Sequence, residues 1–219
     1  MQGHIRSFIF LALLCPLASM AQSDGPSPES VEALVPGLVS VADAACASVT
    51  TRTDATAHGL DRSAMQAMSD IDQMGDDADP AAVRSRLDKL ADEVGPLDAF
   101  PMLRLHFLLG YLAGREGNVQ QQAYHRAYAL ALTQVIEKNG RGESEEHALR
   151  PCLIANEYDW LQFRAGIDNP GDQALVNSGQ YHYDVYHADL GDAKATIYFD
   201  VTDMIEQTEH ALSSGTASH

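Results

Sequence analysis

The sequence predicts an α+β fold in which helices come first and a mainly antiparallel sheet follows. Apolar residues recur at the spacing of helical faces throughout residues 31–139. From residue 140 to residue 212, short runs rich in aromatic and aliphatic residues are separated by Gly, Pro, Asn and Asp, as strands are separated by turns. Between the two patterns stands Asn139-Gly140, and both residue types tolerate the left-handed conformation at a helix end.

The first 21 residues have the layout of a secretory signal peptide. Arg6 precedes an apolar run from Phe8 to Leu17, and Ser19 and Ala21 predict cleavage after Ala21. The run would form roughly 15 Å of helix, half the thickness of a bilayer core. We therefore expect an exported protein, periplasmic or secreted, with no stable membrane insertion after cleavage. An uncleaved N-terminal anchor is the alternative.

The polar residues 22–30 predict a disordered leader, and residues 31–139 a helical part. The expected order is a helix started by Ser27 and Pro28 and kinked at Pro36-Gly37, a loop over 50–64, an amphipathic segment over 65–71, and a helix over 80–94 capped by Asp79.

The end of the helical part predicts two antiparallel helices joined at Gly117-Asn118. Leu109-Gly110 in the first helix and an alanine-rich face on the second make the pair similar to a tetratricopeptide hairpin. One such hairpin cannot bury its own apolar face, so it must pack on neighbouring segments.

The β-rich part, residues 140–212, predicts strands and a closing helix, followed by a disordered tail over 213–219. Because a proline donates no ladder hydrogen bond, Pro151 must lie on an edge or at a bulge. The predicted strands are 148–161, 173–179, 181–189 and 195–201, and the helix is 202–212, capped by Thr202.

Charge and cysteine content limit the partners and the compartment. The net charge of −17 disfavours nucleic acid, whose phosphates would repel the chain. Cys46 and Cys152 remain after cleavage, and both lie in apolar surroundings. Buried thiols are the simpler interpretation, and a disulfide in an oxidising compartment is the alternative.

From about Leu105 to Val201 the chain resembles an uncharacterised family of bacterial secreted proteins, in which a tetratricopeptide-like hairpin precedes a small sheet. The resemblance implies the fold, but no activity. It rests on Gly140-Arg141-Gly142, Ser144-Glu145-Glu146, Glu157-Tyr158, Gln173-Ala174-Leu175, Tyr183-Asp184-Val185 and Tyr198-Phe199-Asp200, in that order.

Glu157-Tyr158 is the most distinctive polar pair of that set. On a strand, the two side chains would point to opposite faces, so one of them would be buried. A buried Glu157 needs a partner, because an unpaired buried charge is very costly. Arg150, Arg164 or backbone N–H groups are the expected partners, and a structural role is favoured over a catalytic one.

His182 and Asp184 are the other candidates for chemistry. They would share one face of a strand, with His187 on the opposite face. The pair could supply two metal ligands or an acid–base couple, although a solvated strand edge is the simpler interpretation. His106, His125 and His147 show no metal-ligand spacing, and no fingerprint of a cofactor site is present, so no cofactor is expected.

These observations favour a non-enzymatic, exported protein-interaction module whose partner is another exported protein or peptide. That hypothesis requires an exposed apolar groove near the helical hairpin. The alternatives are a hydrolase in which Glu157, His182 and Asp184 converge in one cleft, and a protein that binds metal at His182 and Asp184. The oligomeric state is left open.

Overall fold

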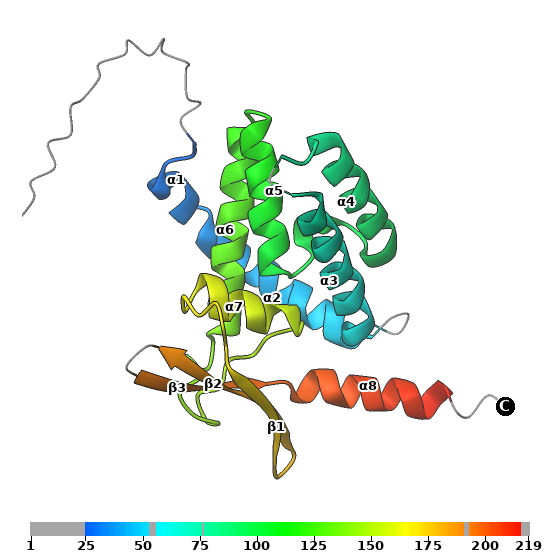
Figure 1. Cartoon of the computed structure of the whole chain (residues 1–219), viewed down its shortest axis with the longest axis vertical. Helices are drawn as coiled ribbons and strands as arrows, with labels where there is room; N and C mark the ends of the chain where they lie inside the picture. The colour runs from blue at the N-terminus through cyan, green and yellow to red at the C-terminus, as the bar shows by residue number, and fades with distance from the viewer. Residues whose placement is uncertain (1–24, 53–55, 76, 191–192, 216–219) are drawn as a thin grey trace, which may run out of the picture.

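The computed structural model describes residues 25–52, 56–75, 77–190 and 193–215, and it confirms an α+β fold with helices first and an antiparallel sheet after them (Figure 1). The predicted signal peptide, residues 1–21, lies outside the described residues. Among the described residues, no helix is both long enough and apolar enough to cross a membrane.

Among the described residues, the helical part contains six α-helices and a short 3₁₀ helix, and the remaining elements follow residue 140. In chain order the elements are α1 (Pro28–Glu32), α2 (Val35–Thr51), α3 (Ala57–Met74), α4 (Pro80–Val94), the 3₁₀ helix η1 (Leu97–Ala99), α5 (Leu103–Arg115), α6 (Val119–Ile136), α7 (Ala155–Phe163), β1 (Asp172–Ser178), β2 (Tyr181–Leu190), β3 (Ala193–Asp200) and α8 (Thr202–Gly215).

Two predicted helix starts are confirmed by their caps. Ser27 Oγ accepts the backbone N–H of Ser30 at 3.2 Å, and Asp79 Oδ1 accepts that of Ala81 at 3.1 Å. The kink predicted at Pro36-Gly37 is instead a break at Ala33–Leu34, just before Pro36 becomes the second residue of α2. Because α1 begins at Pro28, the predicted disordered leader, residues 22–30, extends too far.

The loop predicted over residues 50–64 was also too long. α3 starts at Ala57, where Thr56 accepts the backbone N–H of Gly59 at 3.0 Å. The start of this helix was not predicted because its sequence is polar and because three of its seven buried residues are alanines, which give a weak apolar pattern. Its buried face is formed by Ala57, Leu60, Asp61, Ala64, Ala67, Met68 and Ile71.

The helical hairpin is α5 and α6, and it packs against α2 (Figure 1). Gly110 lies where the two helices touch, and an added Cβ atom there would be in ordinary van der Waals contact with His125 Cβ, at 3.5 Å. The alanines of α6 at positions 123, 127 and 131 are buried, as expected for a close helix pair. The hairpin therefore gains its missing cover from α2.

The strand predicted over residues 148–161 is wrong. Only Leu149 contributes a bridge, parallel to Phe199, and the chain then turns into α7. Pro151 precedes that helix and is not part of an edge strand. The N-terminus of α7 is held from a distance, because Asp61 Oδ1 on α3 accepts the Ala155 N–H at 2.9 Å. That tertiary cap stabilises a helix in a segment whose composition favours a strand.

The other three strands are confirmed, in the order β1-β2-β3 and antiparallel throughout. The outer edge of β3 is covered by the segment that follows α6, since Tyr198 N donates to Gly142 O at 2.9 Å and Asp200 N to Leu149 O at 2.7 Å. α6 ends at Ile136, and Gly142, with φ of 83°, is the residue there with a left-handed backbone. The glycine turn is thus the junction between helices and sheet.

Two covalent and terminal features complete the fold. Cys46 on α2 and Cys152 form a disulfide, with Cα atoms 5.1 Å apart, so the interpretation as buried thiols was wrong.

The closing helix α8 reaches Gly215, which shortens the predicted disordered tail, residues 213–219. Its start is capped by Asp200, whose Oδ1 accepts the Thr202 N–H at 3.1 Å, and not by Thr202.

Candidate functional site

An apolar groove with a volume of about 660 Å³ opens beside the α5–α6 hairpin. Its walls come from the end of α1, the start of α2, both hairpin helices and the end of α7. Figure 1 shows how α7 lies against the hairpin. Six of the eleven lining residues are apolar, and the other five are polar or charged. The lining residues are Glu32, Val35, Pro36, Leu103, Phe107, Leu130, Thr133, Gln134, Glu137, Phe163 and Arg164.

Large apolar side chains remain exposed in this groove. Phe107, Leu130 and Phe163 are 39%, 46% and 48% exposed. The Phe107 and Phe163 rings meet edge to face, with centroids 4.8 Å apart. Exposed apolar surface that gathers in a concavity is typical of a docking site. The groove lies where the interaction hypothesis requires one.

A polar clamp fixes the end of the groove nearest the sheet. Glu137 Oε1 accepts hydrogen bonds from Trp160 Nε1 at 3.1 Å and from Arg164 Nε at 2.8 Å. These bonds tie α7 to the residue that follows α6. The wall containing Phe163 is therefore held in place and is not a loose flap.

Glu157 and Asp184, two of the predicted catalytic residues, do lie together. Glu157 is completely buried on α7, and its Oε2 accepts the Tyr186 hydroxyl at 2.9 Å. Its Oε1 has no hydrogen-bond partner among the described residues, and the charge of nearby Asp184 adds to the cost of ionising the carboxyl group. Burial, and then the charge of Asp184, raise the pKa of Glu157 well above its usual value.

The raised pKa indicates that Glu157 holds its proton more tightly than an exposed glutamate does, because burial and the neighbouring acid both disfavour its ionised form. Burial also raises the pKa of Asp184. On β1, Gln173 Oε1 accepts the Tyr158 hydroxyl at 3.1 Å. A chain of two polar contacts, Tyr158 to Gln173 on β1 and Glu157 to Tyr186 on β2, therefore fastens α7 to the sheet.

His182 takes no part in that chain. Its Nδ1 bonds to Asn177 Oδ1 at 2.8 Å, and its backbone N–H donates to Thr202 Oγ1 at 2.9 Å. His187 bonds to Thr196 on β3 at 3.3 Å. The structure therefore brings together Glu157 and Asp184 but not the third member of the predicted hydrolase set. Since Glu157 is wholly buried, a substrate has no access to its carboxyl group.

The partners expected for Glu157 were wrong as well. Arg150 lies 3.5 Å from Asp200 and 3.3 Å from Asp203, and Arg164 pairs with Glu137. The error follows from the assumed strand. On a helix, Glu157 faces the sheet, while Tyr158 is 41% exposed.

The other buried polar residues of α7 cap the neighbouring helix α5, which lacks a local cap. Asn156 Oδ1 accepts the Leu103 N–H at 3.1 Å, and Asp159 Oδ2 accepts the Arg104 N–H at 2.9 Å. Burial raises the pKa of Asp159 to about 7, although the bond from Arg104 opposes this shift. These side chains satisfy backbone donors that would otherwise be buried without partners.

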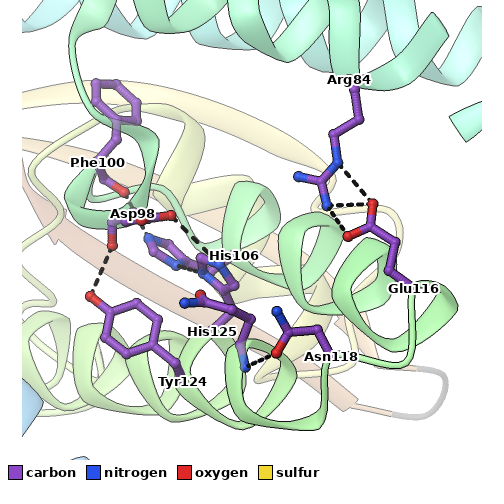
Figure 2. A network of polar contacts seen from close by, with 9 residues as sticks. Arg84, Asp98, Phe100, His106, Glu116, Asn118, Tyr124 and His125 are labelled. Carbon is purple, nitrogen blue, oxygen red and sulfur yellow. Dashed lines mark hydrogen bonds and ion pairs between the residues drawn. The ribbon is translucent and has the colours of Figure 1, made fainter. Parts of the chain in front are cut away.

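A second polar network, centred on His106 and His125, joins the hairpin to η1 and to Phe100, the residue that follows η1 (Figure 2). Three successive carbonyl oxygens accept hydrogen bonds from ring groups of the hairpin. Tyr124 donates to Asp98 O at 3.2 Å, Tyr128 to Ala99 O at 3.0 Å, and His106 Nε2 to Phe100 O at 3.0 Å.

These bonds fix the tautomers of both histidines. Since a carbonyl only accepts, His106 carries its proton on Nε2, and its Nδ1 accepts from His125 Nδ1 at 3.1 Å. Burial, and then the neighbouring His125, lower the pKa of His106 to about 3. Burial also lowers the pKa of His125, an effect that Asp98, with Oδ1 3.7 Å from His125 Nε2, partly offsets.

The histidine pair is a structural joint rather than a reactive centre. His106 is completely buried, and it stacks on Tyr128 with ring centroids 4.0 Å apart. Both of its nitrogens are occupied within the protein. Within the described part of the chain, no group of three or more His, Cys, Asp or Glu side chains is placed to hold a metal ion.

Comparison with protein-family models, with curated proteins and with solved structures finds no match for this chain. The resemblance to the secreted bacterial family therefore stays a prediction. Sequence reasoning expected a groove near the hairpin but did not identify its lining, because its walls come from segments more than 100 residues apart, such as Val35 and Phe163.

Proposed function

We propose that the protein is an exported, non-enzymatic interaction module whose apolar groove beside the α5–α6 hairpin binds a segment of a partner protein or peptide. The observation that carries this proposal is the gathering of Phe107, Leu130 and Phe163, all more than a third exposed, in one concavity of about 660 Å³. Soluble proteins that expose such surface use it for binding.

The dimensions of the groove support a short segment as the partner. A volume of about 660 Å³ matches that of sites for small molecules or a few side chains, and it is too small to admit a folded domain. The aromatic wall favours apolar anchors on the partner, since aromatic pairs add about 0.5–1.5 kcal/mol beyond area burial.

Charge adds a second requirement. The chain has a net charge of −17, and the groove is lined by two acidic residues, Glu32 and Glu137, and one basic residue, Arg164. A partner with basic residues flanking its apolar anchors would be attracted to this surface, and an acidic partner would be repelled. The proposed ligand is therefore an apolar segment with a basic flank.

The exported location is supported by the predicted signal peptide over residues 1–21 and by the Cys46–Cys152 disulfide. Disulfides persist in oxidising compartments and are rare in the cytosol. The partner then belongs to the same compartment.

The single tryptophan of the chain provides the test. Trp160 bonds to Glu137, which lines the groove, so its fluorescence reports on occupancy. We expect tryptophan-free peptides that combine Phe or Leu anchors with Lys or Arg to change this signal saturably. The Leu130→Asp variant should weaken binding at least about tenfold, the effect of losing one apolar anchor.

Val41→Asp is the matched control, because Val41 is 40% exposed on α2 but does not line the groove. It should bind like the wild type. Equal affinities for the wild type and Leu130→Asp, or no saturable binding to any such peptide, would contradict the proposal.

A further inference from the structure

The outer edge of β1 is unpaired and lacks the usual protection of an exposed sheet edge. Among the described residues, the sheet order ends at β1, and residues 172–177 are all exposed. Figure 1 shows the β1–β2 hairpin projecting away from the helices. Natural edge strands are commonly blunted by lysine, proline or a bulge. The sequence Asp-Gln-Ala-Leu-Val-Asn-Ser contains neither residue, and its pairing with β2 is regular.

The hydrogen-bond pattern identifies which backbone groups of β1 face outward. The carbonyl of His182 accepts the Val201 N–H at 2.9 Å, and its own N–H donates to Thr202, so both groups point away from β1. Antiparallel strands alternate, so the odd-numbered residues of β2 bond to β1. Their partners include Ala174 and Val176. The N–H and C=O groups of Gln173, Leu175 and Asn177 therefore point outward.

We propose that this edge pairs with the same edge of a second copy of the chain, antiparallel about a two-fold axis at Leu175. The two three-stranded sheets then form one continuous sheet. Each outward residue exchanges both of its backbone hydrogen bonds with one residue of the other copy, so that position 175 meets position 175 and position 173 meets position 177.

The side chains of β1 are complementary to themselves in this register. Leu175, 53% exposed, meets its own counterpart. The uncharged Gln173 falls opposite the uncharged Asn177, and their side-chain oxygens keep their bonds to Tyr158 and His182 within each copy. The one charged residue, Asp172, falls opposite Ser178 and not opposite another acid. In a chain of net charge −17, a central stretch without charge is what a self-association edge needs. An extended peptide of another protein would gain nothing from this symmetry.

The two acidic copies repel each other at long range, and salt screens that repulsion. Sedimentation velocity of the mature chain should therefore detect a dimer whose population rises with protein concentration and with ionic strength. A chain that is monomeric at every concentration and salt level would overturn the proposal.

Leu175→Pro is the decisive variant, because the Leu175 N–H faces outward and is not needed for pairing with β2. The matched control is Leu175→Thr, which also removes the leucine but keeps the N–H. We expect Leu175→Pro to raise the dimer dissociation constant at least about tenfold above that of Leu175→Thr, since each lost backbone bond is paired with its symmetry mate. Equal dissociation constants for the two variants would contradict edge pairing.

Amide exchange of the unmodified chain tests the same inference without a substitution. In the dimer, the N–H groups of Gln173, Leu175 and Asn177 should become protected as concentration rises, while those of Ala174 and Val176 stay protected throughout. If the three outward amides become protected only after another protein is added, the edge pairs with a strand of that protein. This result would contradict pairing with a second copy of the chain. Unprotected outward amides at all concentrations would overturn it as well.

Discussion

Glu157 is completely buried, and the charge of nearby Asp184 adds to the cost of ionising it. A neutral carboxyl group avoids that cost and still accepts the Tyr186 hydroxyl. Sequence reasoning selected both residues, but their contact depends on how α7 packs on β2, and neighbours along the chain do not reveal that packing. Their partner Tyr186 was missed for the same reason, although it is among the largest fully buried side chains.

Glu157→Gln should preserve this site and alter its pH dependence. The amide oxygen still accepts from Tyr186 and the side chain keeps its size, so the free energy of unfolding should change by less than about 1 kcal/mol at pH 4. The folded pKa of Glu157 lies above its unfolded value of 4.5, so its stabilising contribution is present below pH 4.5 and is lost as pH rises toward the folded pKa. The glutamine variant does not lose it.

Urea unfolding across a pH series measures this difference. The free energy of unfolding of Glu157→Gln minus that of the wild type should grow above pH 4.5 by up to about 1.4 kcal/mol per pH unit. Glu157→Ala, which leaves a cavity and an unpaired tyrosine hydroxyl, should cost about 2–4 kcal/mol. If the free energies of unfolding of Glu157→Gln and the wild type differ by the same amount at every pH, the pKa of Glu157 is not raised in the folded state.

At the scale of elements, helices capped by a neighbouring residue could be predicted from the sequence. The helix α7, which is capped by a residue far away in the chain, could not. α1 and α4 have their caps within three residues of their first turn. α7 is capped by Asp61, 94 residues earlier, and its nine residues are too few to show a helical period clearly. The three confirmed strands are at least seven residues long, contain aromatic or aliphatic residues and are bounded by turn residues, so their pattern was readable.

The cap of α7 can be tested on its own. Asp61→Ala should lower the free energy of unfolding by about 1–2 kcal/mol, because the Ala155 N–H is left buried without an acceptor. Asp61→Asn keeps an oxygen acceptor and should lose much less. Chemical denaturation of the three proteins at one pH gives the comparison, and equal losses for Ala and Asn would contradict the role of the side-chain oxygen.

At the scale of the whole molecule, the Cys46–Cys152 disulfide joins the helical part to the segment that leads into α7. It closes a loop between residues 106 positions apart. The sequence alone did not decide whether the two cysteines form a disulfide, since two cysteines in apolar surroundings also fit buried thiols. Only the packing of α2 beside residue 152 decides between them, and such packing is not encoded locally.

Loss of the disulfide should destabilise the whole fold without changing its architecture. Cys46→Ala with Cys152→Ala should lower the free energy of unfolding by about 2–5 kcal/mol, mainly because the unfolded chain regains the freedom of a long loop. Urea unfolding of the wild type with and without reductant should give a similar difference. A wild type that unfolds identically under both conditions would contradict the bridge.

The three hydrogen bonds that the hairpin donates to carbonyl groups of η1 and Phe100 also bear on the order in which the chain folds. Its three carbonyl bonds join residues 6, 26 and 29 positions apart, whereas the caps of α5 and α7 supplied from other elements span 53, 55 and 94. Closing a short loop costs less entropy than closing a long one, and local contacts form faster. We therefore expect residues 97–128 to fold early as a nucleus, and the docking of α7 and the sheet to be the late, rate-limiting step.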